Sequence, residues 1–584
     1  MKPLSASIEE LKRNDRQWQA FSIEGHCVVT APPGSGKTKL LSTRIAFDLA
    51  THIPAPQGAA CVTLTNAAAG ELNRRVNALT DQRRRNLFVG TVHAFALKEI
   101  IRPFASVCGF SDLLDRKIAT TKQVNAAYRV AVSEVYLSGE DTRNVASTAK
   151  QHLTMLATDE EWRKAGPRIQ KVAQRYSEIL ATQGLVDFDT LIRSALRMVE
   201  ENSFVRRLLI SKFPRIYVDE YQDLAPALDR IVRLLCFGEE SKAVLFAVGD
   251  YNQAIYGWLG SRPELLKEIG LLDGVTPVEL KINYRCAQEI IDAANRLLEV
   301  GGVEGTRSGG SVEAHYCPGT LFVQYNKAAG SIAQLISEGT PPHEIAVLCP
   351  TNDHSARFVK LCRQLDIPAV DQGSPYVSTT FTTLIEQLAV WVVHGDDDSI
   401  ERSRLLLEWK YLQEEVPDGL GSEVALLKAL RETQPADSAA SFLGRLMSSG
   451  PGDESGLLRP EDQTSCVELR EMFDSGGPLM QWTVSELSER GRRIGQVQVC
   501  TMTASKGLEF DYVLIMCAND GIIPHFLSQY SAAKMAEDQR KFYVSVTRAR
   551  LETHIYYSDR SEWLTTGNSR LSGPSRFLRQ MGLA

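Results

Sequence analysis

A glycine-rich run near the N-terminus has the residue types and spacing of a phosphate-binding loop. Its members are Ala31, Pro32, Pro33, Gly34, Ser35, Gly36, Lys37 and Thr38, with alanine where the usual pattern begins with glycine. The two glycines allow backbone N–H groups to approach a phosphate chain, Lys37 can neutralise its outer charge, and Thr38 can ligate Mg²⁺. The run therefore predicts a site for a nucleoside triphosphate and its metal ion.

An acidic pair further along the chain could complete this chemistry. Asp219 and Glu220 follow an apolar run at residues 215–218, which places both carboxylates at the carboxyl end of a predicted strand. Asp219 can hold Mg²⁺ through its water shell, and Glu220 can orient and deprotonate the attacking water in phosphoryl transfer. Alone, such a pair is more often a solvated acidic turn, so the phosphate-binding loop is what favours the catalytic interpretation.

Two arginines have surroundings that suit stabilisation of a transition state. Arg285 follows Asn283 and Tyr284, and Arg548 follows Thr547. A planar, permanently charged guanidinium can bind γ-phosphate oxygens while the bond breaks. An arbitrary arginine is usually a surface charge, so this interpretation depends on the neighbouring residues.

Short apolar runs that end in polar residues must position these side chains. One set occupies residues 26–30, 60–64, 215–218 and 244–248, and a second set occupies residues 345–349, 497–501, 512–516 and 553–557. Residues 39–50, after the phosphate-binding loop, have helical periodicity. Because parallel sheets place ligand sites at the carboxyl ends of their strands, we expect an α/β fold with two parallel-sheet cores.

Two stretches of different character interrupt these sets. Residues 102–185 and 376–487 carry mainly helical patterns, so we expect two helical insertions. A chain of 584 residues, 43% of them hydrophobic, can bury several cores. The predicted domains are a first core (1–101 and 186–285), a first insertion (102–185), a second core (286–375 and 488–584) and a second insertion (376–487).

Composition excludes several classes of protein. Eleven cysteines without a C-x-x-C pair argue against a zinc ribbon or an iron–sulfur cluster. The N-terminus lacks a signal-peptide pattern, and no run approaches the roughly 20 apolar residues that span a bilayer, so we expect a cytoplasmic protein. A net charge of −6 does not exclude nucleic acid, because a binding groove needs only a local basic lining.

In their order, these motifs resemble those of the UvrD/Rep group of superfamily 1 DNA helicases, from about residue 11 to the last residues. Further runs that carry the resemblance are Asn14-x-x-Gln17, Thr65-Asn66, Gly90-Thr91-Val-His93, Asp187-Phe-Asp189, Gly249-Asp250-Tyr-Asn-Gln253-Ala-Ile-Tyr256-Gly-Trp258, and residues 501–510 and 540–549. The resemblance implies two RecA-like P-loop cores, ATP and Mg²⁺ as cofactors, and single-stranded or tailed duplex DNA as partner. It also implies 3′-to-5′ movement.

The same resemblance implies roles for individual residues. The catalytic set is Lys37, Asp219, Glu220, Gln253, Arg285 and Arg548. Beyond the loop, the nucleotide contacts are Gln17, Tyr284, Arg285, Glu509 and Arg548, with Thr38 and Asp219 as metal ligands. The DNA contacts are Thr65, Asn66, Thr91, His93, Tyr256, Trp258, Thr501 and Lys506. Gln17 would read adenine, and Tyr256 and Trp258 would stack on bases, although a lone tryptophan is more often a core residue.

Four positions depart from the family pattern. Leu64, Ala67, Leu259 and Thr503 stand where the family commonly has an aromatic residue, a lysine, an arginine and a histidine, respectively. These substitutions predict a looser grip on the DNA strand. The set of residues for ATP hydrolysis is complete.

The build of the chain bears on its biological role. Both predicted insertions are short for the family, and the chain ends soon after the second core, so any nuclease is expected to come from a partner. This compact build resembles the helicase subunit of Gabija-type anti-phage defence systems, which works with a separate ATPase–nuclease subunit. Three functions stay open: a helicase in defence or DNA repair, an ATP-dependent DNA-end sensor that activates a partner nuclease without extensive unwinding, and an ATP-binding structural protein. The complete ATPase set disfavours the third.

Overall fold

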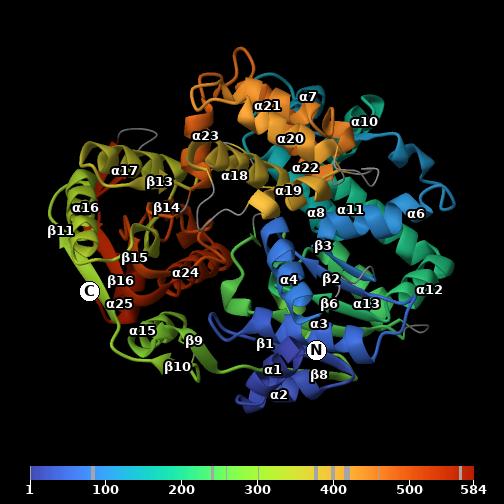
Figure 1. The fold of residues 1–584 in the computed structure, drawn as a ribbon, viewed down its shortest axis with the longest axis horizontal. Helices are drawn as coiled ribbons and strands as arrows, with labels where there is room; N and C mark the ends of the chain where they lie inside the picture. Colours follow the sequence, from blue (N-terminus) through green and yellow to red (C-terminus); the bar gives the residue numbers. More distant parts are fainter. Residues whose placement is uncertain are drawn as a thin grey trace. The chain divides into compact units, whose positions relative to one another are not determined.

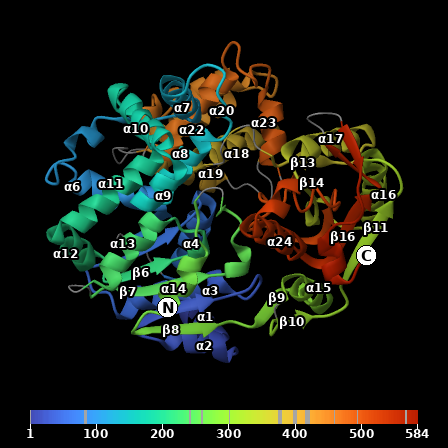
Figure 2. The same cartoon turned by 180° about the vertical axis from the view of Figure 1, so that it is seen from behind.

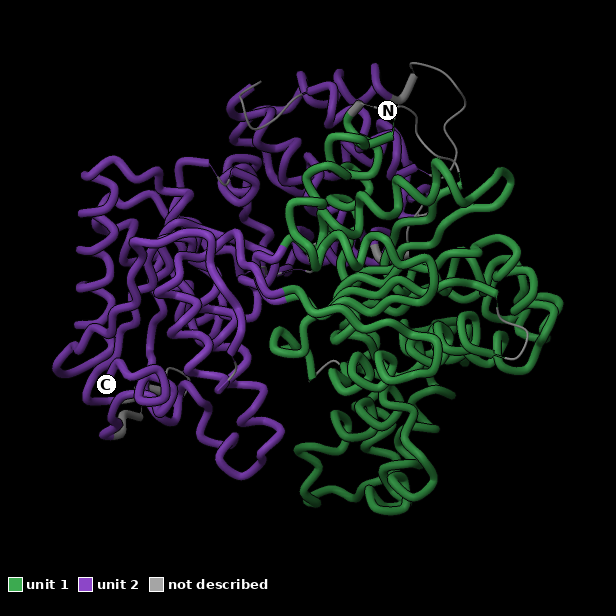
Figure 3. The backbone as a smooth tube through the Cα atoms, turned by 90° about the horizontal axis from the view of Figure 1, so that it is seen from below, with its two compact units in different colours: residues 1–31, 36–280 green, residues 32–35, 281–584 purple. Residues whose placement is uncertain are grey.

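The protein forms two compact units, each built around a parallel sheet. The computed structural model describes residues 2–80, 86–238, 242–257, 260–299, 301–373, 376, 379–395, 402–413, 421–457, 460–492, 494–563 and 568–584. The first unit comprises residues 1–31 and 36–280, and the second comprises residues 32–35 and 281–584 (Figure 3). Two parallel sheets with many helices confirm the predicted fold class.

The sheet of the first unit has the strand order β3-β2-β6-β7-β1-β8, and all of its pairings are parallel (Figure 1). Its strands are β1 (His26–Thr30), β2 (Ala59–Thr63), β3 (Leu87–Thr91), β6 (Arg215–Val218), β7 (Val244–Gly249) and β8 (Val275–Glu279). Successive side chains point to opposite faces. Val28 and Val29 therefore belong to two different hydrophobic cores, one on each side of the sheet.

Helices cover both faces of this sheet. One face packs against α1 (Lys2–Leu11), α2 (Asp15–Ser22), α3 (Lys37–Thr51) and α4 (Asn66–Leu79). The other packs against α5 (Val92–Phe95), the π-helix η1 (Ala96–Ile101), α11 (Phe188–Glu201), α12 (Ser203–Lys212), α13 (Pro226–Cys236) and α14 (Glu264–Gly270). Short 3₁₀ helices, η3 (Tyr221–Asp223) and η4 (Tyr251–Gln253), follow β6 and β7. Each of these two strands thus ends in a tight turn that carries motif residues.

A helical segment with its own core interrupts the first unit. Its elements are α6 (Arg102–Phe104), η2 (Ser111–Leu114), β4 (Lys117–Ile118), α7 (Thr121–Val135), α8 (Val145–Thr154), α9 (Asp159–Ala165), α10 (Pro167–Thr182) and β5 (Leu185–Val186). Tyr128 and Tyr176 stack at its centre with ring centroids 3.7 Å apart. The Tyr176 hydroxyl donates to Asp187 at 2.5 Å, which ties this core to the start of α11.

The sheet of the second unit is also parallel, in the order β11-β16-β15-β12-β14-β13. Its strands are β11 (Ser311–Cys317), β12 (Ile345–Cys349), β13 (Ala369–Asp371), β14 (Val497–Thr501), β15 (Phe510–Ile515) and β16 (Ala549–Ser558). The accompanying helices are α15 (Gln288–Leu298), α16 (Leu321–Ser337), η6 (Pro342–Glu344), α17 (Asn352–Gln364), η8 (Phe526–Tyr530), α24 (Ala532–Val546) and α25 (Arg576–Met581). Figure 2 shows β11 at the outer edge of this sheet, beside α16.

Two small ribbons and a second helical segment complete this unit. The ribbons pair β9 (Ile282–Ala287) with β10 (Glu304–Arg307), and β17 (Arg560–Trp563) with β18 (Asn568–Leu571). The helical segment contains α18 (Thr380–His394), α19 (Arg402–Tyr411), α20 (Gly421–Arg431), α21 (Ala439–Ser448), η7 (Glu454–Gly456), α22 (Pro460–Phe473) and α23 (Val484–Gly491). Trp409 is fully buried in its core. The boundaries of the four domains expected above stay a prediction.

None of the helices in the described ranges combines the length and apolar character needed to cross a membrane.

Candidate functional site

The phosphate-binding loop joins β1 to α3, and Gln17 lies against it. Gly36 caps α3 in the left-handed conformation (φ 82°, ψ 24°), which glycine adopts without steric cost. A Cβ at Gly36 would lie 2.7 Å from Nε2 of Gln17. The side chain of Asn14 accepts from the backbone N–H of Gln17 at 3.1 Å and so fixes the start of α2. The predicted adenine-reading residue is therefore held beside the loop.

Lys37 and Glu220 meet at the carboxyl end of the first sheet. Lys37 is the first residue of α3, and its Nζ lies 3.5 Å from Oε2 of Glu220. The Lys37 ammonium is buried and makes no hydrogen bond within the described part of the chain. A buried ammonium without a hydrogen-bond acceptor calls for an explanation, and a phosphate oxygen would supply the missing acceptor. Thr38, the next residue, is half-buried.

Asp219 and Glu220 take up a constrained turn directly after β6. Asp219 is buried, and its N–H donates to the carbonyl of Val62 at 2.9 Å, which continues the sheet by one residue. The N–H of Glu220 donates to Oδ1 of Asp219 at 3.1 Å. Glu220 itself is left-handed (φ 54°, ψ 49°), a conformation that costs a non-glycine residue about 1–3 kcal/mol and clusters at functional sites. The Asp219 carboxylate thus accepts from the backbone of the turn, whereas the Glu220 carboxylate lies near Lys37.

A buried glutamine connects this turn to the next motif. Gln222 is fully buried; its Nε2 donates to Oε2 of Glu220 at 2.6 Å, and its Oε1 accepts from the N–H of Asp250 at 2.9 Å. Asp250 accepts in turn from Nε2 of Gln253 at 2.7 Å. Hydrogen bonds thus run from Glu220 to Gln253. Sequence analysis assigned no role to Gln222 or Asp250, although both stand inside the motif runs, because a motif does not reveal which side chains face each other.

The same cluster holds a second carboxyl near Lys37. Burial raises the pKa of Asp250 above its ordinary value, Lys37 opposes that shift, and Glu220 adds to it. A Cβ at Gly249 would lie 2.6 Å from Oε1 of Gln222, so only glycine leaves space for this arrangement. Lys37 therefore lies near two carboxylates, those of Glu220 and Asp250.

The second unit holds residues 32–35 of the loop together with Arg285. Pro32, Pro33 and Ser35 are buried, and the Ser35 hydroxyl donates to the carbonyl of Pro32 at 2.7 Å. The carbonyl of Gly34 accepts from the N–H of Tyr284 at 2.8 Å. A Cβ at Gly34 would lie 2.5 Å from Cβ of Arg285, which explains glycine at this position.

Arg285 and Arg548 are held in different ways within the second unit. Nε of Arg285 donates to Glu509 at 2.7 Å, and Arg550 donates to the other oxygen of Glu509 at 3.2 Å. Burial raises the pKa of Glu509, but the two arginines outweigh it, and the net effect is a lowered pKa. Arg548 is 1% exposed and donates to the carbonyls of Val544 (2.9 Å) and Leu508 (3.2 Å). Tyr284 is 41% exposed.

Two of the predicted DNA-contacting threonines also cap helices. Thr65 accepts from a backbone N–H of α4 at 3.2 Å, and Thr91 accepts from one of α5 at 3.2 Å. Asn66 is the first residue of α4. The ring of His93 lies 4.7 Å from the ring of Phe188. A threonine that accepts a cap bond can still donate its own proton to a phosphate, so the structural role does not compete with a DNA contact.

The remaining predicted DNA contacts lie in both units. Tyr256 follows η4 and is half-buried, whereas Trp258 and Leu259 lie outside the described residues. Thr501 ends β14 and accepts from the N–H of Ala504 at 3.2 Å. Lys506 lies half-buried in the following turn.

Comparison with known proteins agrees with this geometry. The sequence model of the UvrD/REP helicase N-terminal domain matches residues 13–270, and that of the UvrD-like helicase C-terminal domain matches residues 479–560. Together they match more than half of the chain.

Full-length relatives match over almost the whole sequence. The chain is 26% identical to "ATP-dependent DNA helicase UvrD2" of Mycobacterium tuberculosis, over 99% of this chain and 82% of the relative. It is 26% identical to "ATP-dependent DNA helicase Rep" of Escherichia coli, over 98% of this chain and 94% of the relative. It is also 26% identical to "ATP-dependent DNA helicase PcrA" of Staphylococcus epidermidis, over 97% of this chain and 86% of the relative. With the ordered motifs and the two parallel-sheet cores, these matches show that the chain belongs to the UvrD/Rep family of ATP-hydrolysing superfamily 1 helicases.

Proposed function

We propose that the protein is a DNA translocase that hydrolyses Mg²⁺-bound ATP, moves along one DNA strand in the 3′-to-5′ direction, and thereby separates the strands of tailed duplexes. The observation that carries the proposal is the buried ammonium of Lys37, which lies 3.5 Å from the carboxylate of Glu220 at the end of the first sheet. A phosphate-binding cation beside a general base is what hydrolysis of a γ-phosphate requires.

Each predicted site residue has a proposed task. Lys37 binds the outer phosphate oxygens, and Glu220 accepts the proton of the attacking water, in the orientation that Gln222 gives it. Thr38 and Asp219 would hold Mg²⁺, which neutralises charge on the phosphates when it is bound. Gln253 responds to the γ-phosphate through its bond to Asp250. Arg285 and Arg548 would stabilise the transition state, and Gln17 and Tyr284 would bind the adenine.

The first test is ATP hydrolysis by the purified chain, with and without single-stranded DNA. Lys37→Ala should abolish hydrolysis, whereas Glu220→Gln should retain ATP binding and lose about 10²–10⁴ in kcat, the usual contribution of a general base. Lys39→Ala is the matched control, because Lys39 lies on the same helix and pairs with the exposed Glu10 instead. Hydrolysis at the wild-type rate in both Lys37→Ala and Glu220→Gln would refute the assignment.

The second test concerns polarity. Duplexes with a 3′ or a 5′ single-stranded tail should be unwound unequally, with the 3′-tailed duplex preferred. Equal unwinding of both, or preference for the 5′ tail, would contradict the proposed direction while leaving the ATPase assignment intact.

A second candidate function is favoured by the substituted strand contacts. With Leu64, Ala67 and Thr503 in place of an aromatic residue, a lysine and a histidine, the chain could bind DNA ends in an ATP-dependent manner and activate a separate nuclease, as in anti-phage defence. ATPase stimulation by DNA without unwinding of any tailed duplex would support this sensor instead of the translocase.

A further inference from the structure

Three potential metal ligands lie on one face of the second sheet, at its β11 edge. Glu313 and His315 belong to the edge strand β11, and His554 belongs to its neighbour β16. The parallel register pairs Glu313 with His554 directly, and His315 lies two residues further along β11, on the same face. Two neighbouring strands therefore present their side chains to one point.

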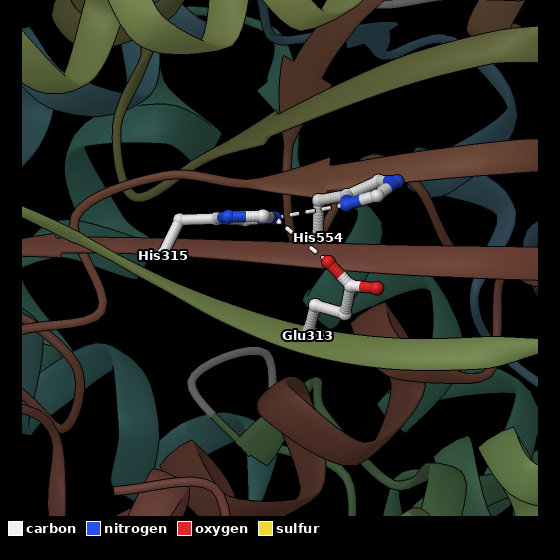
Figure 4. A group of neighbouring side chains, drawn as sticks. All are labelled: Glu313, His315 and His554. Carbon is white, nitrogen blue, oxygen red and sulfur yellow. Dashed lines mark hydrogen bonds and ion pairs between the residues drawn. The ribbon is translucent and has the colours of Figure 1, made fainter.

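The donor atoms have nearly the spacing that a metal ion requires. Nε2 of His315 lies 2.9 Å from Nδ1 of His554 and 3.7 Å from Oε2 of Glu313, and Figure 4 shows the His315 ring directed at both. All three donors lie within 4.8 Å of one another. Ligands about 2.0–2.1 Å from a tetrahedral Zn²⁺ are separated by about 3.3 Å. Small side-chain rotations would therefore place all three donors around one ion.

A fourth side chain prepares His554 for coordination. Oε2 of Glu552 lies 3.1 Å from Nε2 of His554. A carboxylate at that nitrogen keeps the proton there, so the lone pair is left on Nδ1, the atom that faces the other two donors. Metal-binding histidines usually have such a carboxylate or carbonyl behind them.

The burial of the three donors also suits a metal site. Both histidines are mostly buried, with side chains 21% and 13% exposed, whereas Glu313 is 56% exposed and leaves access from solvent.

We propose that Glu313, His315 and His554 bind one divalent ion of the zinc class, with water in the fourth position. Two imidazoles and one carboxylate favour Zn²⁺ over Mg²⁺ or Ca²⁺, which prefer oxygen ligands. His554 follows Arg548 by six positions, about 20 Å along an extended strand. The ion would therefore join the edge strand β11 to β16 and stabilise the sheet rather than take part in ATP hydrolysis.

The test is Zn²⁺ binding by the full-length chain after treatment with a chelator, measured against a competing chromogenic chelator in excess Mg²⁺. We expect one tightly bound ion in the wild type, and none at this site in His315→Ala or His554→Ala. His152→Ala, in α8 of the first unit, is the matched control and should bind like the wild type. Co²⁺ in the site should give a spectrum without thiolate charge transfer, which excludes the eleven cysteines as ligands.

Two further variants separate metal binding from folding. Glu552→Gln should keep one ion per chain but weaken its binding about 10–100-fold, as for other residues behind a metal ligand. Zn²⁺ should raise the thermal midpoint of the wild type and not that of Glu313→Gln, because only a ligand that binds the folded chain stabilises it. If the wild type binds no Zn²⁺, or if the histidine variants bind as much as the wild type, the contact is a hydrogen bond between two imidazoles and the proposal is wrong.

Discussion

Gln222 occupies the point at which two motifs of the candidate site meet. Its amide nitrogen donates to Glu220 and its amide oxygen accepts from the backbone of Asp250, and it is fully buried. An amide can bind a carboxylate and a backbone N–H at once because it has both a donor and an acceptor. Its task, in our proposal, is to orient the general base.

Gln222→Glu tests this task with almost no change in shape. The new carboxylate would lie beside Glu220, and a like charge raises the pKa of a neighbouring acid. We expect the acidic limb of the pH profile of kcat to move to higher pH. The value of kcat should fall about tenfold or more, and by no more than the 10²–10⁴ that a general base contributes. The KM for ATP should change little.

The double variant with Glu220→Gln is the control. If Gln222 acts through Glu220, the second substitution should add almost nothing, because residues that act as a unit are not additive. If Gln222→Glu lowers kcat by the same factor in the wild type and in Glu220→Gln, the substitution causes a general loss of structure instead.

At the scale of elements, the predicted strands are the interior ones. The first set of apolar runs corresponds to β1, β2, β6 and β7, and the second to β12, β14, β15 and β16, which are the four inner strands of each sheet. The edge strands β3, β8, β11 and β13 were missed. An inner strand is buried on both faces and reads as a continuous apolar run, whereas an edge strand tolerates polar residues.

Particular residues show why the apolar runs did not predict the edge strands. β8 contains Pro277, which an edge strand accommodates because one side of it needs no hydrogen bond. β11 carries the polar residues Glu313 and His315 in its interior and therefore has no continuous apolar run. The positions of Lys37, Asp219 and Gln253 could be predicted because each closely follows an inner strand. Those of Gln17, Arg285 and Arg548 came from the family resemblance alone. The contacts of Gln222 and Glu509 depend on segments far apart in the chain, which local patterns do not relate.

The attachment of α3 to the first sheet gives a prediction at this scale. Asp48, fully buried on α3, accepts from Nε of Arg44 at 2.7 Å and from the hydroxyl of Tyr217 on β6 at 2.5 Å. Asp48→Ala would leave the buried Arg44 without its counter-charge, and we expect a loss of about 3–5 kcal/mol in the free energy of unfolding. Tyr217→Phe removes one hydrogen bond and should cost about 1 kcal/mol.

Urea unfolding followed by circular dichroism would check this order. Asp141→Ala, which removes an exposed ion pair with Arg143, should leave the unfolding midpoint unchanged. An Asp48→Ala variant as stable as Tyr217→Phe would show that α3 is held by its apolar contacts alone.

At the scale of the whole molecule, a motor must relate ATP hydrolysis to its grip on DNA. The segment after β7 is suited to this because Gln253, bonded to Asp250 beside Lys37, precedes Tyr256 by only three residues. A shift of η4 on loss of the γ-phosphate would move the proposed base-stacking tyrosine with it. The short path between these two side chains is the physical basis for coupling in our proposal.

Tyr256→Ala tests the coupling without touching the ATPase residues. Stacking on a base contributes about 1–3 kcal/mol, so half-maximal stimulation of ATP hydrolysis should need about 5–150 times more single-stranded DNA, while hydrolysis without DNA stays at the wild-type rate. Tyr256→Phe keeps the ring and should behave like the wild type. Tyr251→Ala is the matched control, because this ring in the same segment packs under Lys267, 3.8 Å from its Nζ. If Tyr256→Ala responds to DNA as the wild type does, the stacking role is wrong; if hydrolysis without DNA also fails, Tyr256 supports the nucleotide site itself.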